Sequence, residues 1–301
     1  MSRMRLDKLL SMNGVSRSQA IVIVRSGAVT VNGEPVLNSA TIIETEGADI
    51  RIMSYNLMNP DWSKVPVTDR VPKVVNIIQD YQPDVIGIQE ANGKWQKALK
   101  PVLVETGLYN PACRQSNADG FKYNMSAFMY NVATVQLVDE YVLDLDPGSD
   151  IRVFAVAVFE KLSDGTRFVV ANTHPASSTD TEVYARNCAD IMEIGAAEMA
   201  KYADLPFIMT GDYNTRESSE MYQTLMNTLG VKDAKYEADV MVRDQGTYFE
   251  WGTEPAPKAD DCIDHIFVNG KTDVKLYNVV IDHDVQNTSD HFPIYADIDL
   301  Q

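Results

Sequence analysis

Short apolar runs that end at a polar side chain recur along most of this 301-residue chain. A run of this kind, bounded by turn residues, is typical of a strand buried in a β-sheet. The pattern predicts strands at 50–54, 84–88, 126–130, 168–171, 207–210, 263–268 and 292–300. Because binding sites lie beyond strand ends in layered α/β folds, we expect the polar side chains to come together.

Segments with helical periodicity lie between some of the predicted strands. Apolar residues recur at i, i+3, i+4 and i+7 from Val71 to Ile78, and Asp69 and Pro72 are typical of the start of such a helix. A further helix containing Arg186 is expected after the strand at 168–171. The alternation of strands and helices predicts an α/β fold.

The first 47 residues follow another pattern. Leucines at helical spacing over 6–10 predict a short helix, and Ser16 with Gln19 forms the capping-box pattern of a second one. Residues 29–31 then alternate as a strand, and Asn32-Gly33 is a strong hairpin turn signal.

No flexible linker separates this segment from the rest of the chain. A strand-like run at 41–46 leads through Gly47 into the strand at 50–53 without a Gly/Ser-rich or Pro-rich stretch. We therefore expect two domains, 1–47 and 48–301, that abut with little freedom.

The order of helix, cap, helix and hairpin resembles the small RNA-binding domain shared by ribosomal protein S-four, rRNA pseudouridine synthases and tyrosyl-tRNA synthetases. The resemblance covers about residues 3–47 and rests on RLDKLL, VSRS, RSG and VTVNGE in that order. In that family the first two helices lie against RNA. The resemblance implies RNA contacts by Arg5, Lys8, Arg17 and Arg25.

Charge is distributed unevenly between the two parts. The formal net charge of −17 argues against general binding of polyanions, because phosphate affinity comes largely from Lys and Arg. Residues 1–47 hold five Lys or Arg against four Asp or Glu, a net charge of +1, which leaves −18 for the remainder. By its charge, only the first segment is suited to binding RNA. The alternative to an RNA-binding domain is an N-terminal extension with a solvated basic face.

Composition is ordinary for a globular protein, with 45% hydrophobic and 23% charged residues. Three cysteines without a CxxC pair favour a reducing compartment over disulfides or a zinc site. No apolar run approaches the ~18 residues of a membrane helix, and the N-terminus has no signal-peptide pattern. We expect a soluble, cytoplasmic protein without a membrane span.

Six polar clusters follow or precede the predicted strands. They are Tyr55-Asn56, Gln89-Glu90, Asn172-Thr173-His174, Gly211-Asp212-Tyr213-Asn214, Asp264-His265 and Ser289-Asp290-His291. A single polar residue at such a place is most often a cap, a turn residue or a solvated group. Six in series favour one site that binds Mg²⁺ through carboxylates and substrate phosphate and activates a water. Gly211 is expected to let the backbone turn sharply after its strand.

These motifs, in this order and spacing, resemble those of the endonuclease/exonuclease/phosphatase superfamily, which has the deoxyribonuclease I-like fold. The resemblance covers about residues 50–301. It implies a four-layer α/β sandwich, two sheets flanked by helices, preceded by the small α/β RNA-binding-like module. It also implies hydrolysis of a phosphate ester with Mg²⁺ as the cofactor and Mn²⁺ as an alternative.

The resemblance assigns a metal-binding role to three residues. Glu90 is implied to be the principal Mg²⁺ ligand, and Asn56 to lie beside it and orient the metal or the phosphate. Asp290 is implied to be a second carboxylate close to the metal.

The resemblance assigns catalytic roles to five more. Asp212 is implied to position or deprotonate the attacking water, while Asn214 holds that water or a phosphate oxygen. His291 is implied to be an acid/base or a phosphate donor oriented by Asp264, and His174 a further phosphate donor. A partner carboxylate raises the basicity of a histidine, which suits such work near neutral pH.

One position departs from the family pattern. Many members with a histidine in the Asn-Thr-His motif have a Glu six residues before the tyrosine that corresponds to Tyr130, where this chain has Asn124. An amide hydrogen-bonds His174 but does not stabilise its imidazolium, which argues against a protonated His174. His265 and His283 are expected to be structural or surface residues.

The favoured function is that of a Mg²⁺-dependent nuclease that hydrolyses phosphodiester bonds in nucleic acid, with RNA bound by the N-terminal module. The acidic catalytic domain favours an alternative, a phosphatase or phosphodiesterase acting on a small or lipid-linked phosphate ester. A second alternative is an RNA-binding protein with an inactive hydrolase domain. The fold hosts all these functions, so it does not choose among them.

Overall fold

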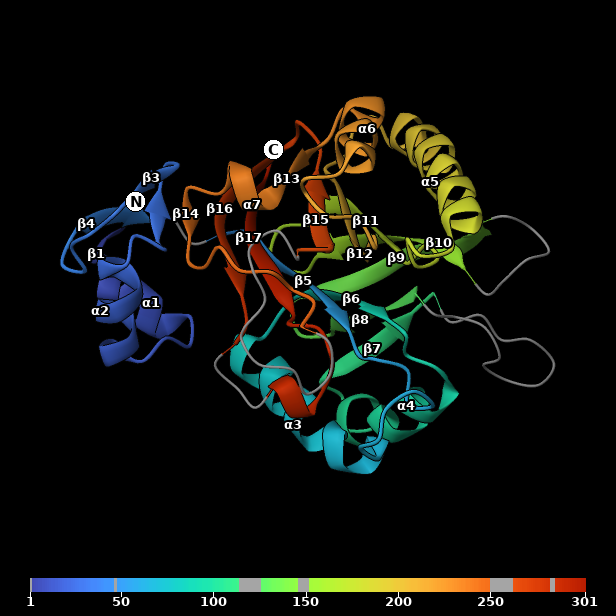
Figure 1. The fold of residues 1–301 in the computed structure, drawn as a ribbon, viewed down its shortest axis with the longest axis horizontal. Coiled ribbons are helices and arrows are strands. Elements are labelled where there is room, and N and C mark those ends of the chain that lie inside the picture. The colour runs from blue at the N-terminus through green and yellow to red at the C-terminus, as the bar shows by residue number, and fades with distance from the viewer. Residues whose placement is uncertain (1, 46–47, 114–125, 146–151, 250–261, 282–284) are drawn as a thin grey trace.

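Two β-sheets lie face to face, with helices on their outer faces, in a computed structural model of the protein (Figure 1). The structure describes residues 2–45, 48–113, 126–145, 152–249, 262–281 and 285–301. Within them, one sheet has six strands in the order β13-β15-β12-β11-β10-β9. The other has nine, in the order β3-β2-β14-β16-β17-β5-β6-β8-β7.

The six-stranded sheet is made of β9 (Val135–Asp144), β10 (Val153–Lys161), β11 (Arg167–Thr173), β12 (Phe207–Asp212), β13 (Lys232–Asp233) and β15 (Asp264–Val268). The nine-stranded sheet is made of β2 (Thr30–Val31), β3 (Glu34–Pro35), β5 (Ile50–Asn56), β6 (Val85–Gln89), β7 (Tyr109–Ala112), β8 (Ser126–Asn131), β14 (Val240–Met241), β16 (Thr272–Val279) and β17 (Ile294–Leu300).

Helices complete a four-layer sandwich. Those outside the nine-stranded sheet are α3 (Val67–Tyr81) and α4 (Gly93–Leu99), followed by a π-helical turn at Lys100–Val104. Those outside the six-stranded sheet are α5 (Thr181–Lys201) and α6 (Glu220–Leu229), and the short α7 is Ala234–Glu237. The predicted α/β fold is thus confirmed.

The strands that carry the polar clusters run side by side. β5 and β6 are parallel, with Asn56 opposite Gln89, and β11 and β12 are parallel, with Thr173 opposite Gly211. β12 contacts β5 and β6 across the two sheets, and the carboxyl ends of all four strands lie at one edge of the sandwich.

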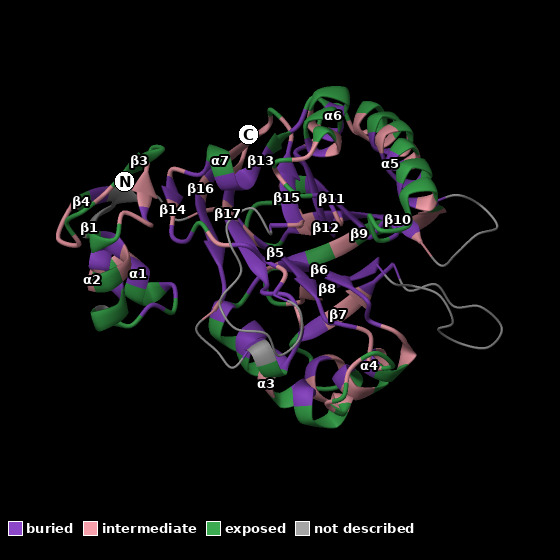
Figure 2. Ribbon diagram, viewed as in Figure 1, coloured by how far each residue is buried: buried purple, intermediate pink, exposed green. Residues whose placement is uncertain are grey.

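The core lies between the sheets, where the strands are buried while the outer helix faces are exposed (Figure 2). All residues of β6 and β12 are buried, as their near-continuous apolar sequences predicted. The sheets approach closely at Gly87, where a Cβ atom would lie 2.0 Å from Oγ1 of Thr210. A larger residue at position 87 would clash with the side chains of Thr210 and Asn172 from the facing sheet.

The N-terminal module consists of β1 (Ser2–Arg5), α1 (Leu6–Met12), α2 (Arg17–Arg25), the β2–β3 hairpin and β4 (Ile42–Thr45). The predicted capping box is present, because the Ser16 side chain accepts from the Gln19 backbone and the Gln19 side chain accepts from the Ser16 backbone. The predicted hairpin is present too. The strand β1, which pairs antiparallel with β4, was not predicted.

The sequence predicts that the two domains abut, but the structure joins the module to the larger domain through a shared sheet. β2 pairs antiparallel with β14, so the module's hairpin extends the nine-stranded sheet. Oδ1 of buried Asn13 accepts hydrogen bonds from Nη2 of Arg51 and from the Tyr295 hydroxyl, each at 3.0 Å. Backbone and side-chain hydrogen bonds therefore fix the module against the sheet.

One predicted helix start is confirmed for Asp69 and wrong for Pro72. The helix α3 begins at Val67, directly after Pro66, so Asp69 lies in its first turn and Pro72 lies inside it. Pro66 explains why the helix begins at Val67. Proline has no backbone N–H, and the residue directly before a helix needs none because its N–H would have no acceptor within the helix. Among the described residues, no helix is both long and apolar enough to cross a membrane.

Candidate active site

Two residues just beyond strand ends have a left-handed backbone. Glu90 follows β6 directly and has a φ of 59°, and Asn214 lies two residues after β12 and has a φ of 51°. Residues with a Cβ rarely adopt this conformation, and such residues cluster at functional sites. Both side chains line the same pocket.

Asn56 joins two carboxylates that come from opposite sheets. Its Nδ2 donates to Oδ2 of Asp212 at 2.9 Å and to Oε1 of Glu90 at 3.3 Å. Its Oδ1 accepts from the backbone N–H of Met58 at 2.8 Å. Because the amide nitrogen faces the carboxylates, Asn56 positions Glu90 and Asp212 in this arrangement.

The chemistry of these carboxylates fits a hard divalent cation. Burial raises the pKa of Glu90, whose Oε2 accepts from the backbone N–H of Asn59 at 2.5 Å. Burial also raises the pKa of Asp212 to about 7. Buried carboxylates need a compensating positive charge, and oxygen donors are the ligands that Mg²⁺ prefers.

His291 is held by Asp264. Its Nδ1 lies 2.7 Å from Oδ2 of Asp264, and its Nε2 lies 3.6 Å from Oδ2 of Asp212. Burial lowers the pKa of His291, but the Asp264 and Asp212 carboxylates outweigh it and raise that pKa well above its usual range. One ligand atom from each of these residues lies within 4.8 Å of the others. Because the raised pKa favours the protonated form of His291, whose nitrogens then have no lone pair for a metal ion, this arrangement favours an acid/base group over a ligand set.

His174 is the second histidine near the carboxylates. Its Nε2 is 3.4 Å from Oδ2 of Asp212 and 3.9 Å from Oε1 of Glu90. Burial lowers the pKa of His174 well below its usual range, and the Arg152 cation adds to this effect. Its buried Nδ1 has no hydrogen-bond partner among the described residues, and Asn124 lies outside them. A neutral His174 offers an N–H donor but no positive charge.

Asn214 and Asp290 border the same space. The Asn214 backbone N–H donates to Oδ1 of Asp212 at 2.9 Å, and its Nδ2 donates to the Pro175 carbonyl at 3.2 Å. Asp290 is half-buried, and its Oδ1 accepts from Oγ of Ser289 at 3.4 Å. Both residues line the pocket.

The pocket around these groups has a volume of about 690 Å³. Among the residues proposed from the sequence, those lining it are Glu90, His174, Asp212, Asn214, Asp290 and His291. Asn56 and Asp264 do not line the pocket, but they hydrogen-bond to residues that do. The pocket walls also include residues that the sequence analysis did not single out, among them Trp62, Arg152, Arg216 and Tyr248.

Arg70 connects two of the loops that form the site. Its side chain is fully buried over the Trp95 ring, with Nε donating to the Thr288 carbonyl at 2.6 Å. Its Nη2 donates to the carbonyls of Met58, at 3.1 Å, and Leu57. The guanidinium thus ties the loop after β5 to the loop that carries His291. The sequence analysis missed this residue, although an arginine on the apolar face of α3 is a signal that it has buried partners.

The role predicted for Gly211 is wrong. Gly211 lies within β12, and a Cβ there would lie 2.5 Å from the Thr173 carbonyl oxygen. The glycine permits close approach of β11 and β12. The turn comes later, at Asn214.

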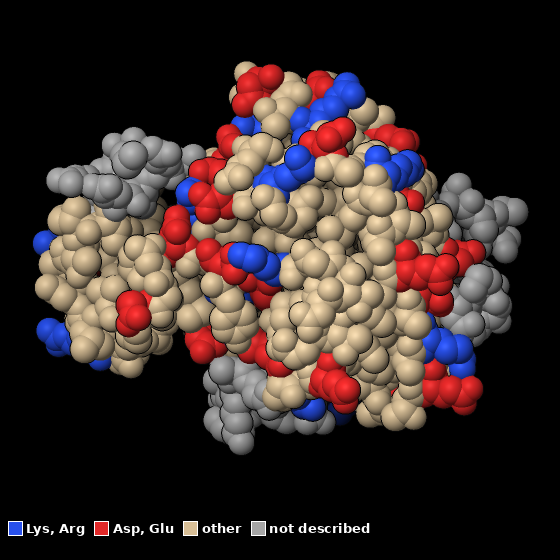
Figure 3. Space-filling model, turned by 90° about the horizontal axis from the view of Figure 1, so that it is seen from above, with Lys and Arg blue, Asp and Glu red and all other residues tan. Residues whose placement is uncertain are grey.

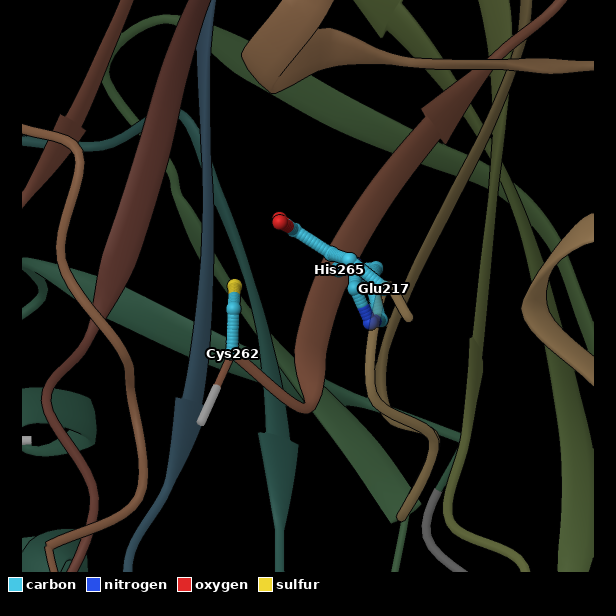
Figure 4. Close-up of side chains that lie close together, drawn as sticks. All are labelled: Glu217, Cys262 and His265. Atoms are coloured by element: carbon cyan, nitrogen blue, oxygen red, sulfur yellow. The ribbon is translucent and has the colours of Figure 1, made fainter. Parts of the chain in front are cut away.

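A second cluster lies beside β15 and contains Glu217, Cys262 and His265 (Figure 4). Both ring nitrogens of His265 are already engaged at 2.9 Å, Nδ1 by Oδ2 of Asp233 and Nε2 by the Thr215 carbonyl. His265 is therefore a buried structural residue, and its hydrogen bond to Thr215 holds the loop that follows Asn214.

The other residues of this cluster are also engaged. Oε1 of Glu217 accepts from Nζ of Lys235 at 2.8 Å, and burial raises the pKa of the Cys262 thiol well above its usual range. Such a protonated thiol does not bind a metal ion readily. The other unassigned histidine, His283, lies outside the described residues.

The proposed RNA-contacting residues differ in their surroundings. Lys8 and Arg25 are exposed, whereas Arg5 donates to both oxygens of Asp7, at 2.6 and 3.0 Å. The structure does not describe the side chain of Arg17. In one view, acidic side chains are prominent on the larger domain, whereas basic ones lie at the outer edge of the module (Figure 3).

The family model described as the endonuclease/exonuclease/phosphatase family matches residues 53–291, and the model described as the S4 domain matches residues 4–50. A search of curated proteins gave no significant match.

Solved structures with the same fold cover most of the chain. The mannosyl-6-phosphatase of Bacteroides thetaiotaomicron is 21% identical and has a TM-score of 0.67, with 83% of this chain and 99% of that chain covered. The human nocturnin catalytic domain with bound sulfate anion is 19% identical and has a TM-score of 0.64, with coverages of 84% and 93%. The TDP2 of D. rerio complexed with single strand DNA product is 16% identical and has a TM-score of 0.63, with coverages of 83% and 98%. With its N-terminal S4 domain and its strand-end site, the chain belongs to the endonuclease/exonuclease/phosphatase family.

Proposed function

We propose that this protein uses a divalent cation to hydrolyse phosphoesters and that its substrate is a phosphodiester in nucleic acid. The observation that carries the proposal is the meeting of the Glu90 and Asp212 carboxylates with the Asp264–His291 pair in one pocket. Members of this family are hydrolases that act on phosphoesters. The arrangement supplies a metal ligand, a base and a charged donor within reach of one phosphate.

Glu90 and Asp290 would hold Mg²⁺, or Mn²⁺ in its place, with Asn56 positioning Glu90. When bound, the ion neutralises charge on the phosphate and on the leaving oxygen.

Side chains of the pocket carry out the proton transfers and bind the phosphate. Asp212 accepts a proton from the attacking water, because a pKa of about 7 makes it an effective base near neutral pH. Asn214 orients the water or a phosphate oxygen. His291, oriented by Asp264, donates from Nε2 to the phosphate or the leaving group, and neutral His174 donates a second N–H.

Nucleic acid is supported as the substrate by the S4 domain. Its β2 strand continues the nine-stranded sheet, so RNA bound by the module would be held in a fixed relation to the catalytic domain. The similar TDP2 structure holds a single-stranded DNA product.

A compact phosphoester is the second candidate. The pocket of about 690 Å³ has the size of a small-molecule site, and residues 48–301 carry the net charge of −18 derived above. One similar structure is a mannosyl-6-phosphatase. Small or lipid-linked phosphates therefore belong in the same assay as nucleic acids.

The test is hydrolysis by the purified protein with Mg²⁺, in parallel with and without a chelator. The substrates are structured RNA, duplex and single-stranded DNA, nucleotides, hexose phosphates and inositol phosphates. We expect chelator-sensitive cleavage of a nucleic acid. Cleavage confined to small phosphates would select the second candidate, and RNA binding without hydrolysis of any substrate would identify an inactive hydrolase domain.

A further inference from the structure

Trp62 lies on the wall of the pocket and is 60% exposed. Most large apolar side chains of the described residues are buried, and an exposed aromatic ring beside buried catalytic carboxylates is typical of a ligand contact. The mechanism described above does not use this residue.

The loop that carries Trp62 is fixed to the metal-binding carboxylate. The Asn59 backbone N–H donates to Oε2 of Glu90 at 2.5 Å, and the Trp62 backbone N–H donates to the Asn59 carbonyl at 3.0 Å. Nδ2 of Asn92 donates to the side chains of Asn59 at 2.9 Å and Asp61 at 3.2 Å. The Trp62 backbone is thereby held in a defined position relative to Glu90.

Hydroxyl groups provide a second, polar part of the pocket wall. The residues that supply them are Ser177, Ser178, Thr179, Ser218 and Ser219. A flat apolar surface together with several hydroxyls suits a ring that has a C–H or π face and polar substituents.

We propose that Trp62 is a specificity-determining residue that stacks on a ring carried by the substrate next to the scissile phosphate. The ring is either the base and ribose of a nucleotide or a hexose, since both have a flat apolar face and polar edges. This inference rests on the proposed phosphoester hydrolysis and narrows its substrate to ring-bearing esters.

The test compares esters with and without a ring. The substrates are adenosine 5′-monophosphate, glucose 6-phosphate and glycerol 1-phosphate, each as the free monoester and as its methyl diester. Stacking on an aromatic side chain contributes ~1–3 kcal/mol per base, so Trp62→Ala should lower kcat/KM for the preferred ring-bearing ester by about 5- to 150-fold.

Controls separate stacking from a general effect. Hydrolysis of the glycerol esters by Trp62→Ala should stay within about twofold of wild type, because no ring is lost. Trp62→Phe should retain most activity on the ring-bearing esters. Leu162→Ala, which removes a side chain 50% exposed outside the pocket, should change nothing. Thermal unfolding of each variant checks its fold.

The possible outcomes have distinct meanings. Equal losses on all esters, or no loss on any, would overturn the role of Trp62 while leaving phosphoester hydrolysis intact. Hydrolysis of none of them by the wild type would count against a small-ester substrate, and calorimetric binding of the same esters in Ca²⁺ would then decide on Trp62. In that case, equal affinities of wild type and Trp62→Ala for the ring-bearing esters would overturn the proposal.

Discussion

The Nδ1 atom of His291 lies 2.7 Å from Oδ2 of Asp264, and both side chains are buried. The opposite ring nitrogen faces Asp212. Asp264 therefore fixes the orientation of His291 and stabilises its protonated form inside the site.

This contact predicts non-additive mutational effects. Asp264→Asn and His291→Gln should each lower kcat/KM by about 10²- to 10⁴-fold, because each removes the same oriented, charged donor. The double variant should lose little more than either single variant. Steady-state kinetics of the four proteins provide the test, and losses that add in log rate would contradict the pairing.

Glu90→Gln is expected to abolish tight metal binding while the fold persists. The change removes the carboxylate charge, and kcat/KM at limiting Mg²⁺ should fall by at least about 100-fold. Metal binding measured by calorimetry should weaken in parallel. Glu193→Gln changes an exposed glutamate of α5 and is the matched control. A wild-type rate for Glu90→Gln at limiting Mg²⁺ would show that another residue binds the metal.

The His265–Asp233 pair predicts a pH-dependent stability. Burial lowers the pKa of His265, but hydrogen bonding and charge attraction by Asp233 outweigh it, so the folded-state pKa is raised. The stabilisation is therefore complete below the unfolded-state pKa of about 6.5 and is lost as pH rises through the higher folded-state pKa.

His265→Gln should accordingly be destabilising, and more so at pH 6 than at pH 9. Urea unfolding of metal-free wild type and variant across this range gives the difference in the free energy of unfolding. A difference that does not change with pH would mean that the pKa of His265 is the same in the folded and unfolded states, and a smaller difference at pH 6 than at pH 9 would mean that His265 is neutral in the folded protein.

RNA binding by the module should depend on salt and on its basic residues. Replacing Arg5, Lys8, Arg17 and Arg25 with Gln should weaken RNA binding and flatten a salt dependence that corresponds to about two to four phosphates. Arg5→Gln alone should have a smaller effect than Lys8→Gln, because Asp7 already neutralises Arg5.

Filter binding of structured RNA at several salt concentrations measures these effects. Hydrolysis of a small phosphodiester should be unchanged in the same variants, and Lys97→Gln in α4 is the exposed control. Wild-type affinity of the four-Gln variant at every salt concentration would remove the RNA-binding role and favour small phosphates.

Asn13→Ala should loosen the junction between the module and the sheet. The change leaves Arg51 and the Tyr295 hydroxyl without their shared acceptor, at a cost of about 1–3 kcal/mol. Hydrogen exchange should become faster in β2 and in its partner β14. Exchange rates equal to those of the wild type would show that strand pairing alone holds the module.

The sequence by itself determined the strands and the residues at their ends. The apolar runs around Ile86 and Ile208 predict buried strands, and Glu90 and Asp212 come shortly after these runs. Their convergence could be expected because binding sites lie beyond strand ends in layered α/β folds. The Ser16 capping box could also be predicted from the sequence, because all its atoms lie within one helical turn.

Only the tertiary structure decided how distant residues combine. The burial of Arg70, the double engagement of His265, the pairing of β2 with β14 and the place of Trp62 on the pocket wall each depend on segments far apart in the chain. Local periodicity reports which face of an element is buried, but not which partner covers it. The partner is set by how strands pair and how the two sheets pack, and the pairing of β12 with β11 makes Gly211 a close-contact residue and not a turn residue.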